Sequence, residues 1–173
     1  TGGPVIPSST KKVQSAKKLS KIVEEQKASG RRIVFANGCF DVLHVGHIRY
    51  LTEARSLGDI LVVAVNDDSS ARMLKGEGRP WMNEADRLEI LASLSCIDYL
   101  VLFSDRDVSG LLRLYKPHVH AKGTDYTVDN VPEREVVLEY GGKIAITGDP
   151  KTRSSSKIIA QLASQTGPQS KKE

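Results

Sequence analysis

The sequence predicts an α/β protein built on an open, parallel, five-stranded sheet with helices on both faces. Short apolar runs of strand length alternate along the chain with longer stretches whose apolar residues recur at helical spacing. Such alternation is typical of a parallel sheet, because each parallel strand is reached through a crossover connection, usually a helix. The expected strands are residues 32–36, 60–65, 99–103, 118–121 and 143–147.

The expected helices lie before and between the strands. The first covers residues 13–29, where Leu19, Ile22 and Val23 recur on one face and Gly30 gives a C-terminal stop. Right-handed crossovers then place the later helices over the two faces of the sheet. These helices are expected at residues 47–57, 83–95, 107–116, 131–140 and 154–164.

Composition favours one domain with its own core. The chain has 173 residues, of which 39% are hydrophobic and 27% are charged. No apolar run approaches the roughly 20 residues that span a bilayer, and no signal peptide opens the sequence. The two cysteines form no disulfide framework, so we expect a cytoplasmic protein with no membrane partner. Residues 13–165 form the expected domain, between a flexible leader at 1–12 and a polar tail at 166–173.

Charge is distributed unevenly along the chain. Residues 1–32 hold eight Lys and Arg against two Glu, whereas the remainder holds 17 Lys and Arg against 19 Asp and Glu. The net charge of +4 therefore comes from the first segment, and the body is slightly acidic. This distribution argues against a nucleic-acid-binding surface. We interpret the basic segment as a solvated helix face.

The functional site is expected at the carboxyl ends of the strands. In open sheets of this Rossmann-like type, ligands bind there, at the point where the strand order reverses. The segments that follow four of the strands concentrate Gly, His, Lys, Arg and Ser, which suit a polyphosphate. These segments are residues 37–47, 66–80, 122–126 and 147–156.

The stretch from Asn37 to His47 is the centre of the predicted site. His44 and His47 are three residues apart at the expected start of a helix, so both rings can face one anion. A neutral histidine can donate a hydrogen bond, and a protonated one stabilises more charge. Gly38 and Gly46 let the backbone approach a ligand closely. We interpret this turn as a binding site for a nucleoside triphosphate.

Other interpretations of this stretch stay open. The histidines could form a buried pair, or they could ligate a metal, although Cys39 and Asp41 complete no zinc pattern. The strand–turn–helix context also suits a dinucleotide-binding oxidoreductase, with Asp67 or Asp68 as the ribose contact. Against that class, the turn lacks the G-x-G-x-x-G spacing.

A second anion-binding segment is predicted near the C-terminus. Ser154, Ser155 and Ser156 precede an apolar run and suit the N-cap region of a helix, with Arg153 beside them. Serine hydroxyls and the unpaired N–H groups of a helix start can hold a phosphate. The alternative is an ordinary structural cap.

Further cations follow other strands. Lys122 lies between a strand end and Gly123, and Lys75 and Arg79 follow the second strand. Arg87 falls in an expected helix, where a surface salt bridge is its alternative role. We expect these four cations to contact substrate phosphates.

Several other residues receive structural interpretations. Trp81 is expected to pack beneath its loop, with stacking on a base or sugar as the alternative. His118 and His120 alternate along a strand, so one of them is expected to be buried and neither is assigned to the site. Cys39 is interpreted as a small packing residue, because no base is evident beside it.

These motifs resemble those of a known superfamily. The pattern Phe40-Asp41-x-x-His44-x-Gly46-His47 is similar to the HxGH signature of nucleotidyltransferases, and Ser154-Ser155-Ser156-x-Ile158-Ile159 resembles their second signature. Within that superfamily, the chain most resembles the adenylyltransferase domain of ADP-heptose synthases, over about residues 15–165. The stretches that carry this resemblance are residues 37–51, 63–68, 74–80 and 122–126.

The chain departs from that family at two places. Thr124 stands where a second glycine is usual, and serines replace threonines in the closing signature. Glycerol-phosphate cytidylyltransferases share both signatures, but they usually have more arginines than Arg153 in the closing motif and an aromatic-rich loop that only Tyr126 matches. A polyol-phosphate cytidylyltransferase that uses CTP is therefore the alternative function. A non-catalytic nucleotide-binding module is the alternative of a different class.

The resemblance implies that a sugar 1-phosphate, heptose 1-phosphate in the first place, attacks the α-phosphorus of ATP and releases pyrophosphate. It implies that His44, His47 and Lys122 are catalytic through positioning and charge stabilisation. It also implies Mg²⁺ on the nucleotide phosphates, with Asp41 placing the nucleotide or the metal, and it suggests a homodimer.

The expected binding residues fall into two sets. The nucleotide-binding set is Asn37, Gly38, Cys39, Phe40, Asp41, Gly46, Gly123, Arg153, Ser154 and Ser155, and the substrate-binding set is Asn66, Lys75, Arg79 and Arg87.

Overall fold

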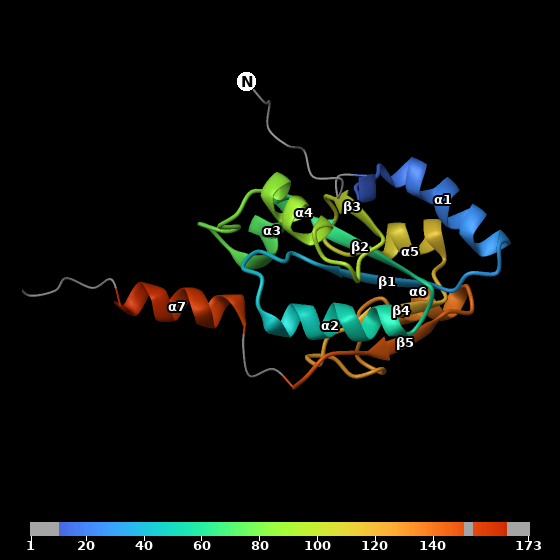
Figure 1. Ribbon diagram of the computed structural model, residues 1–173. Coiled ribbons are helices and arrows are strands. Elements are labelled where there is room, and N and C mark those ends of the chain that lie inside the picture. Colours follow the sequence, from blue (N-terminus) through green and yellow to red (C-terminus); the bar gives the residue numbers. More distant parts are fainter. Residues whose placement is uncertain (1–10, 151–153, 166–173) are drawn as a thin grey trace, which may run out of the picture.

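Five strands form one sheet in the computed structural model, which describes residues 11–150 and 154–165 (Figure 1). Every strand pairing is parallel, and the strand order is β3-β2-β1-β4-β5. The predicted fold class is therefore confirmed. The strands are β1 (Ile33–Gly38), β2 (Ile60–Asn66), β3 (Tyr99–Phe103), β4 (Val119–Lys122) and β5 (Lys143–Ile146).

The helices of the described chain cover both faces of this sheet, except the last one, which has no buried residue and extends away from the sheet (Figure 1). Six of them lie where the sequence predicts helices, with shorter bounds for those between β3 and β4 and between β4 and β5. The helices are α1 (Ala16–Ala28), α2 (Val45–Ser56), α3 (Asp68–Lys75), α4 (Glu84–Ala92), α5 (Ser109–Tyr115), α6 (Arg134–Glu139) and α7 (Ser155–Gln165).

The core consists of two apolar layers separated by the sheet. Successive side chains of a strand point to opposite faces, so Ile33 and Phe35 of β1 join the layer with α1, α5 and α6. Val34 and Ala36 join the layer with α2 and α4. All four side chains are fully buried, which explains why this strand is a continuous apolar run in the sequence.

The side of the sheet on which successive strands are added changes at β1. From this central strand the chain proceeds to β2 and β3 on one side, then crosses over to β4 and β5 on the other. β1 and β4 are therefore the neighbours at the switch point, with Phe35 paired to His120. Their carboxyl ends define the crevice in which such sheets bind ligands.

Helix α3 corrects the sequence analysis, which treated residues 68–75 as loop. The side chain of Asp67 caps this helix by accepting a hydrogen bond from Ser70 N at 2.8 Å. Only Ser70 and Ala71 of the helix are buried, whereas Met73 and Leu74 are exposed. The helix was missed because a single buried turn gives too little apolar periodicity to recognise.

The last two residues of the predicted leader contact the domain. Residues 11 and 12 form a 3₁₀ turn, Lys12 Nζ donates a hydrogen bond to Leu94 O at 2.8 Å, and Val13 forms a β-bridge with Leu100. Residues 1–10 of the leader and the predicted tail at 166–173 lie outside the described residues. Within the described ranges, no helix is long and apolar enough to cross a bilayer.

Leu51 gives a test of the layer beneath the site. It is fully buried on α2, whereas Leu138 on α6 is 51% exposed. Leu51→Ala should lower the free energy of unfolding by about 2–5 kcal/mol, because it removes buried methyl groups and leaves a cavity. Urea denaturation measures the change. Leu138→Ala is the control and should change stability by less than about 1 kcal/mol, and equal losses in both variants would contradict this packing.

Candidate active site

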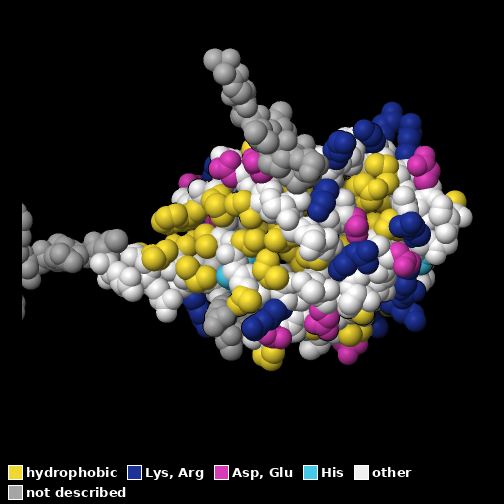
Figure 2. Space-filling model, viewed as in Figure 1, with side chains coloured by type: hydrophobic (Ala, Val, Ile, Leu, Met, Phe, Trp, Pro, Cys, Tyr) yellow, Lys and Arg dark blue, Asp and Glu magenta, His cyan; other side chains and the backbone are white. Residues whose placement is uncertain are grey.

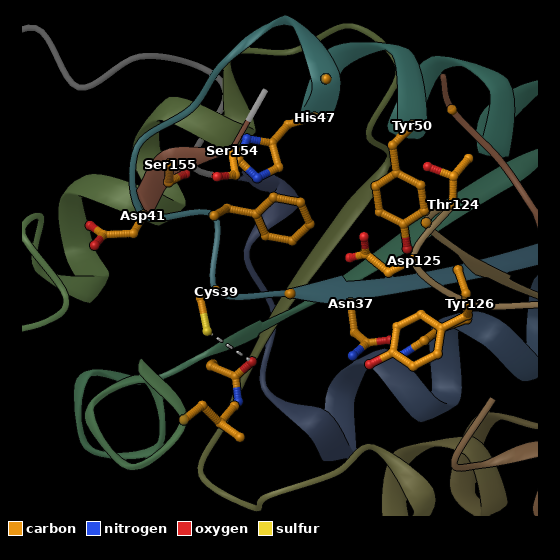
Figure 3. A pocket seen from close by; sticks show the side chains of 18 of the residues that line it. Asn37, Cys39, Asp41, His47, Tyr50, Thr124, Asp125, Tyr126, Ser154 and Ser155 are labelled. Carbon is orange, nitrogen blue, oxygen red and sulfur yellow. Dashed lines mark hydrogen bonds between the residues drawn. The ribbon is translucent and has the colours of Figure 1, made fainter. Parts of the chain in front are cut away.

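A pocket of about 580 Å³ lies at the carboxyl edge of β1 and β4. Its walls come from the turn after β1, the first turns of α2, the segment after β4 and the start of α7 (Figure 3). This volume is in the range of small-molecule and cofactor sites. The predicted residues that line it are Asn37, Gly38, Cys39, Phe40, Asp41, His44, Gly46, His47, Asn66, Lys75, Arg79, Lys122, Gly123, Ser154 and Ser155.

The two histidines cap the first turn of α2. His44 is the N-cap residue, and its Nδ1 accepts a hydrogen bond from Gly46 N at 3.1 Å. Nδ1 of His47 accepts one from His44 N at 3.2 Å. Because both Nδ1 atoms are acceptors, the proton of each neutral ring resides on Nε2. The ring centroids are 4.0 Å apart, so the pair offers two ring N–H donors where the helix dipole already favours an anion.

The backbone of this turn fits closely around the rings. A Cβ at Gly46 would lie 2.8 Å from Cε1 of His44, so only glycine leaves room for the cap. Phe40 adopts a left-handed backbone with φ 50°, and its buried ring packs edge-on against His47 with centroids 5.4 Å apart. A Cβ at Gly38 would in turn lie 3.1 Å from the Phe40 ring. The turn therefore holds His47 by packing as well as by hydrogen bonding.

Asp41 anchors the segment between α3 and α4. Its Oδ1 accepts hydrogen bonds from Trp81 N and Met82 N, both at 2.9 Å, and its Oδ2 pairs with Arg79 Nε at 2.7 Å. Burial alone would raise the pKa of Asp41, but these two backbone N–H groups and the Arg79 guanidinium hold that pKa below its usual range. Both oxygens have hydrogen-bond partners within the chain, and a role of Asp41 in placing the nucleotide or the metal stays a prediction.

Arg87 connects the ends of two strands, so its predicted substrate contact is corrected. Its side chain is fully buried and does not line the pocket. Nη1 donates to Cys39 O and to Asn66 O, both at 2.7 Å, and Nε donates to Met82 O at 3.0 Å. Nη2 pairs with Asp68 at 2.9 Å. Arg87 is therefore a positioning residue that holds the turn after β1 against the end of β2.

Lys122 extends from the end of β4 into the pocket between two neighbours. Its Nζ lies 4.6 Å from the centroid of the Tyr126 ring and 3.7 Å from Oε2 of Glu133. The side chains of Lys122 and Glu133 are 9% and 5% exposed. A cation–π contact and a carboxylate together fix the ammonium group at one wall of the pocket.

The closing serines join α7 to the histidine turn. Ser155 Oγ donates a hydrogen bond to Val42 O at 2.7 Å, and Ser154 Oγ accepts one from Lys157 N at 3.1 Å as a helix cap. Figure 3 shows both serines beside His47. The two predicted anion-binding segments therefore lie together, although Arg153 lies outside the described residues.

Other sequence-based interpretations are settled by burial. His120 is fully buried with Nε2 3.0 Å from Asn37 Oδ1, so the prediction that one histidine of β4 is buried is confirmed. Cys39 Sγ lies 3.6 Å from Asn66 Oδ1, and burial raises the pKa of the thiol, which suits a packing role. Trp81 is 63% exposed, so its expected packing beneath the loop is wrong.

Six charged residues of the lining are missing from the predicted set: Arg49, Arg106, Asp107, Asp125, Glu133 and Asp149. Arg106 follows β3, and the rule about carboxyl ends of strands would have found it. Arg49 lies within α2 and forms an ion pair with Asp149, which the sequence does not signal. Glu133 lies far beyond β4 with no motif around it.

The order of these features along the chain matches a known family. A family model described as cytidylyltransferase-like matches residues 35–161, which include both the histidine turn and the closing serines. The chain belongs to this family. The parallel sheet with a ligand pocket at its switch point is thus the architecture of a cytidylyltransferase-like domain in this protein.

Two curated relatives are similar to this cytidylyltransferase-like domain over most of its length. The bifunctional protein HldE of Pelobacter propionicus is 46% identical over 154 residues, covering 89% of this chain and 32% of the relative. The bifunctional protein HldE of Geobacter sulfurreducens is 47% identical over 151 residues, covering 87% and 31%. The chain therefore spans about a third of the length of these relatives.

Two solved structures share the fold of the family. The lipopolysaccharide core biosynthesis protein from Thermoplasma volcanium GSS1 has 33% identity and a TM-score of 0.62, covering 70% of this chain and 100% of that one. Pantoate-beta-alanine ligase from Francisella tularensis has 18% identity and a TM-score of 0.55, covering 83% and 68%. The second likeness shows the fold alone.

The Gly46→Ala variant tests the histidine cap. Its Cβ would collide with the His44 ring, which should displace the cap, lower the free energy of unfolding by about 1 kcal/mol and weaken binding of a nucleoside triphosphate. Urea denaturation and titration calorimetry measure the two effects. Gly110→Ala in α5 is the control, because nothing lies within 4 Å of its Cβ position. Tight triphosphate binding by Gly46→Ala would contradict this geometry.

His120 predicts an acid-sensitive stability. Burial, with the charge of Lys122, lowers its pKa from 6.5 to about 3, so the unfolded chain binds a proton below pH 6.5 that the native ring does not. Stability should fall as pH falls from 6.5 toward 3, and this site alone should remove about 2 kcal/mol between pH 7.5 and pH 5. Urea denaturation at both pH values measures the loss. His120→Gln has no ring to protonate, so its loss of stability between the two pH values should be about 2 kcal/mol smaller than that of the wild type. An equal loss in both proteins would contradict the assignment to His120.

Proposed function

We propose that the chain is a nucleotidyltransferase domain that joins a sugar 1-phosphate to ATP, giving an ADP-sugar and pyrophosphate. Heptose 1-phosphate is the proposed acceptor, because the chain resembles the adenylyltransferase domain of ADP-heptose synthases and the relatives are bifunctional HldE proteins. The observation that carries the proposal is the pair of imidazole rings that share the N-terminus of α2.

In the proposed reaction, an oxygen of the acceptor phosphate forms a bond to the α-phosphorus of ATP. The bond from that phosphorus to the oxygen bridging to the β-phosphorus breaks, and pyrophosphate leaves. No covalent enzyme intermediate is needed, so the chain acts by positioning the phosphates and by stabilising their charge.

The residues of the pocket divide between the two substrates. Nε2–H groups of His44 and His47 would donate to the α- and β-phosphates as negative charge develops, and Ser154 would contact the β- and γ-phosphates. Lys122 would receive the acceptor phosphate. The other groups proposed to contact substrate are Asn66, Lys75 and Arg79 in the lining.

Mg²⁺ belongs to the proposal as a partner of the nucleotide. Among the described residues no group of three or more His, Cys, Asp and Glu is placed to hold a metal. Mg²⁺ usually keeps several waters and binds through substrate phosphates and one or two carboxylates, so phosphates that lie against His44 and His47 suit it. When bound, the ion neutralises phosphate charge.

A cytidylyltransferase that uses CTP and a polyol phosphate is the second candidate. The family description itself favours it, and so does Tyr126, an aromatic residue in the pocket segment after β4.

The proposal also includes the homodimer that the resemblance suggests, which multi-angle light scattering would test.

A matrix of nucleotides against acceptors tests the proposed function. Pyrophosphate release is measured with ATP or CTP, Mg²⁺, and heptose 1-phosphate, hexose 1-phosphates or glycerol 3-phosphate. We expect the highest kcat/KM with ATP and heptose 1-phosphate. Preference for CTP and a polyol phosphate would support the second candidate, and nucleotide binding without any turnover would indicate a non-catalytic module.

Substitution of His47 separates its two roles. His47→Ala should lower kcat by about 10²–10³-fold, because one charge-stabilising donor is lost. His47→Gln is the matched variant, since a glutamine oxygen at this helix position can still accept the hydrogen bond from His44 N. We expect His47→Gln to keep the thermal stability of the wild type yet lose activity like His47→Ala. Full activity in His47→Gln would show that this ring serves only as a cap.

A further inference from the structure

Glu133 is a buried carboxylate in the pocket wall that has no role in the proposed reaction. Glu133 lies just before α6, lines the pocket, and has a side chain that is 5% exposed. Among the described residues none donates a hydrogen bond to its Oε2. Its nearest charged partner is Lys122, whose Nζ lies 3.7 Å away, beyond hydrogen-bonding distance.

A buried acceptor without a donor is unfavourable, and buried polar atoms in native proteins are almost always paired. An unpaired oxygen in the lining of a ligand pocket is therefore a place where a bound ligand supplies the donor. A carboxylate accepts hydrogen bonds and repels other anions. The group that reaches Oε2 must accordingly be a hydrogen-bond donor and not a phosphate, and on the proposed sugar phosphate that donor is a hydroxyl.

The position of Lys122 limits which hydroxyl this can be. Its ammonium group is fixed between the Tyr126 ring and Glu133, and under the proposed function it receives the acceptor phosphate. An acceptor that bridges both groups must carry a hydroxyl close to its phosphate. The hydroxyl on the carbon next to the phosphate-bearing carbon makes the shortest such bridge.

We propose that Glu133 is a specificity-determining residue that accepts a hydrogen bond from the acceptor hydroxyl vicinal to the phosphate. This inference rests on the proposed function. It does not make Glu133 a general base, because a phosphate monoester is already ionised near neutral pH and the attacking oxygen has no proton to remove. Glu133 instead selects acceptors with a vicinal hydroxyl.

The test compares heptose 1-phosphate with its 2-deoxy analogue. The wild-type protein should use the deoxy acceptor with a kcat/KM about 10–100-fold lower, as expected for a lost hydrogen bond to a charged group. Glu133→Gln should lower kcat/KM for the parent acceptor and leave the deoxy acceptor nearly unchanged, which reduces the discrimination to a few-fold. The KM for ATP should not change.

Glu139→Gln is the matched control. Glu139 is the last residue of α6 and also has an ion pair at 3.7 Å, with Arg113, but its side chain is 61% exposed and does not line the pocket. This variant should keep the wild-type discrimination. If Glu133→Gln instead lowers kcat/KM equally for both acceptors, Glu133 acts only by holding Lys122 and the inference is wrong.

Two measurements keep the test decisive. Equal use of both acceptors by the wild-type protein overturns the inference without any variant, so a poorly folded Glu133→Gln does not matter. Absence of turnover with every acceptor would count against the proposed function instead. In that case calorimetric binding of the two acceptors gives the same comparison, and equal affinities would overturn the role of Glu133.

Discussion

The hydrogen bonds between backbone N–H groups and the two imidazole rings at the start of α2 are the constraint on which the site depends. Each ring accepts a bond at Nδ1, from Gly46 N to His44 and from His44 N to His47. One arrangement thus completes the helix cap and places the proton of each neutral ring on Nε2. The folding of the helix and the polarity of the pocket therefore arise from the same atoms.

Two buried charged side chains hold the neighbouring loops in place beside that turn. Arg87 donates hydrogen bonds to the carbonyl oxygens of Cys39 and Asn66. Asp41 accepts hydrogen bonds from backbone N–H groups of the segment that follows α3. Breaking a buried charged contact by removing one partner is costly, because the other group stays buried without compensation. These contacts hold the turn after β1 and the segment after α3 in place at the carboxyl edge of the sheet.

Two parts of the pocket lining contact different substrates in the proposed reaction. The histidine turn and the closing serines lie within the stretch that matches the cytidylyltransferase-like family, and under the proposed function they hold the nucleotide phosphates. Another part of the lining contains Lys122 at the end of β4, with Tyr126 and Glu133 on the segment that follows this strand. Under the proposed function, this part of the lining contacts the acceptor.

The sequence by itself determined the fold class, the edge of the sheet where the pocket lies and the histidine pair, because periodicity and short motifs are local. It could not determine the roles of Arg87 and Glu133, since their partners are distant along the chain: the Arg87 contact to Cys39 O spans 48 residues. The same residue type suits a surface ion pair or a buried bridge, and only packing decides between them. Tertiary structure alone brought Glu133 beside Lys122 and left one of its oxygens without a donor.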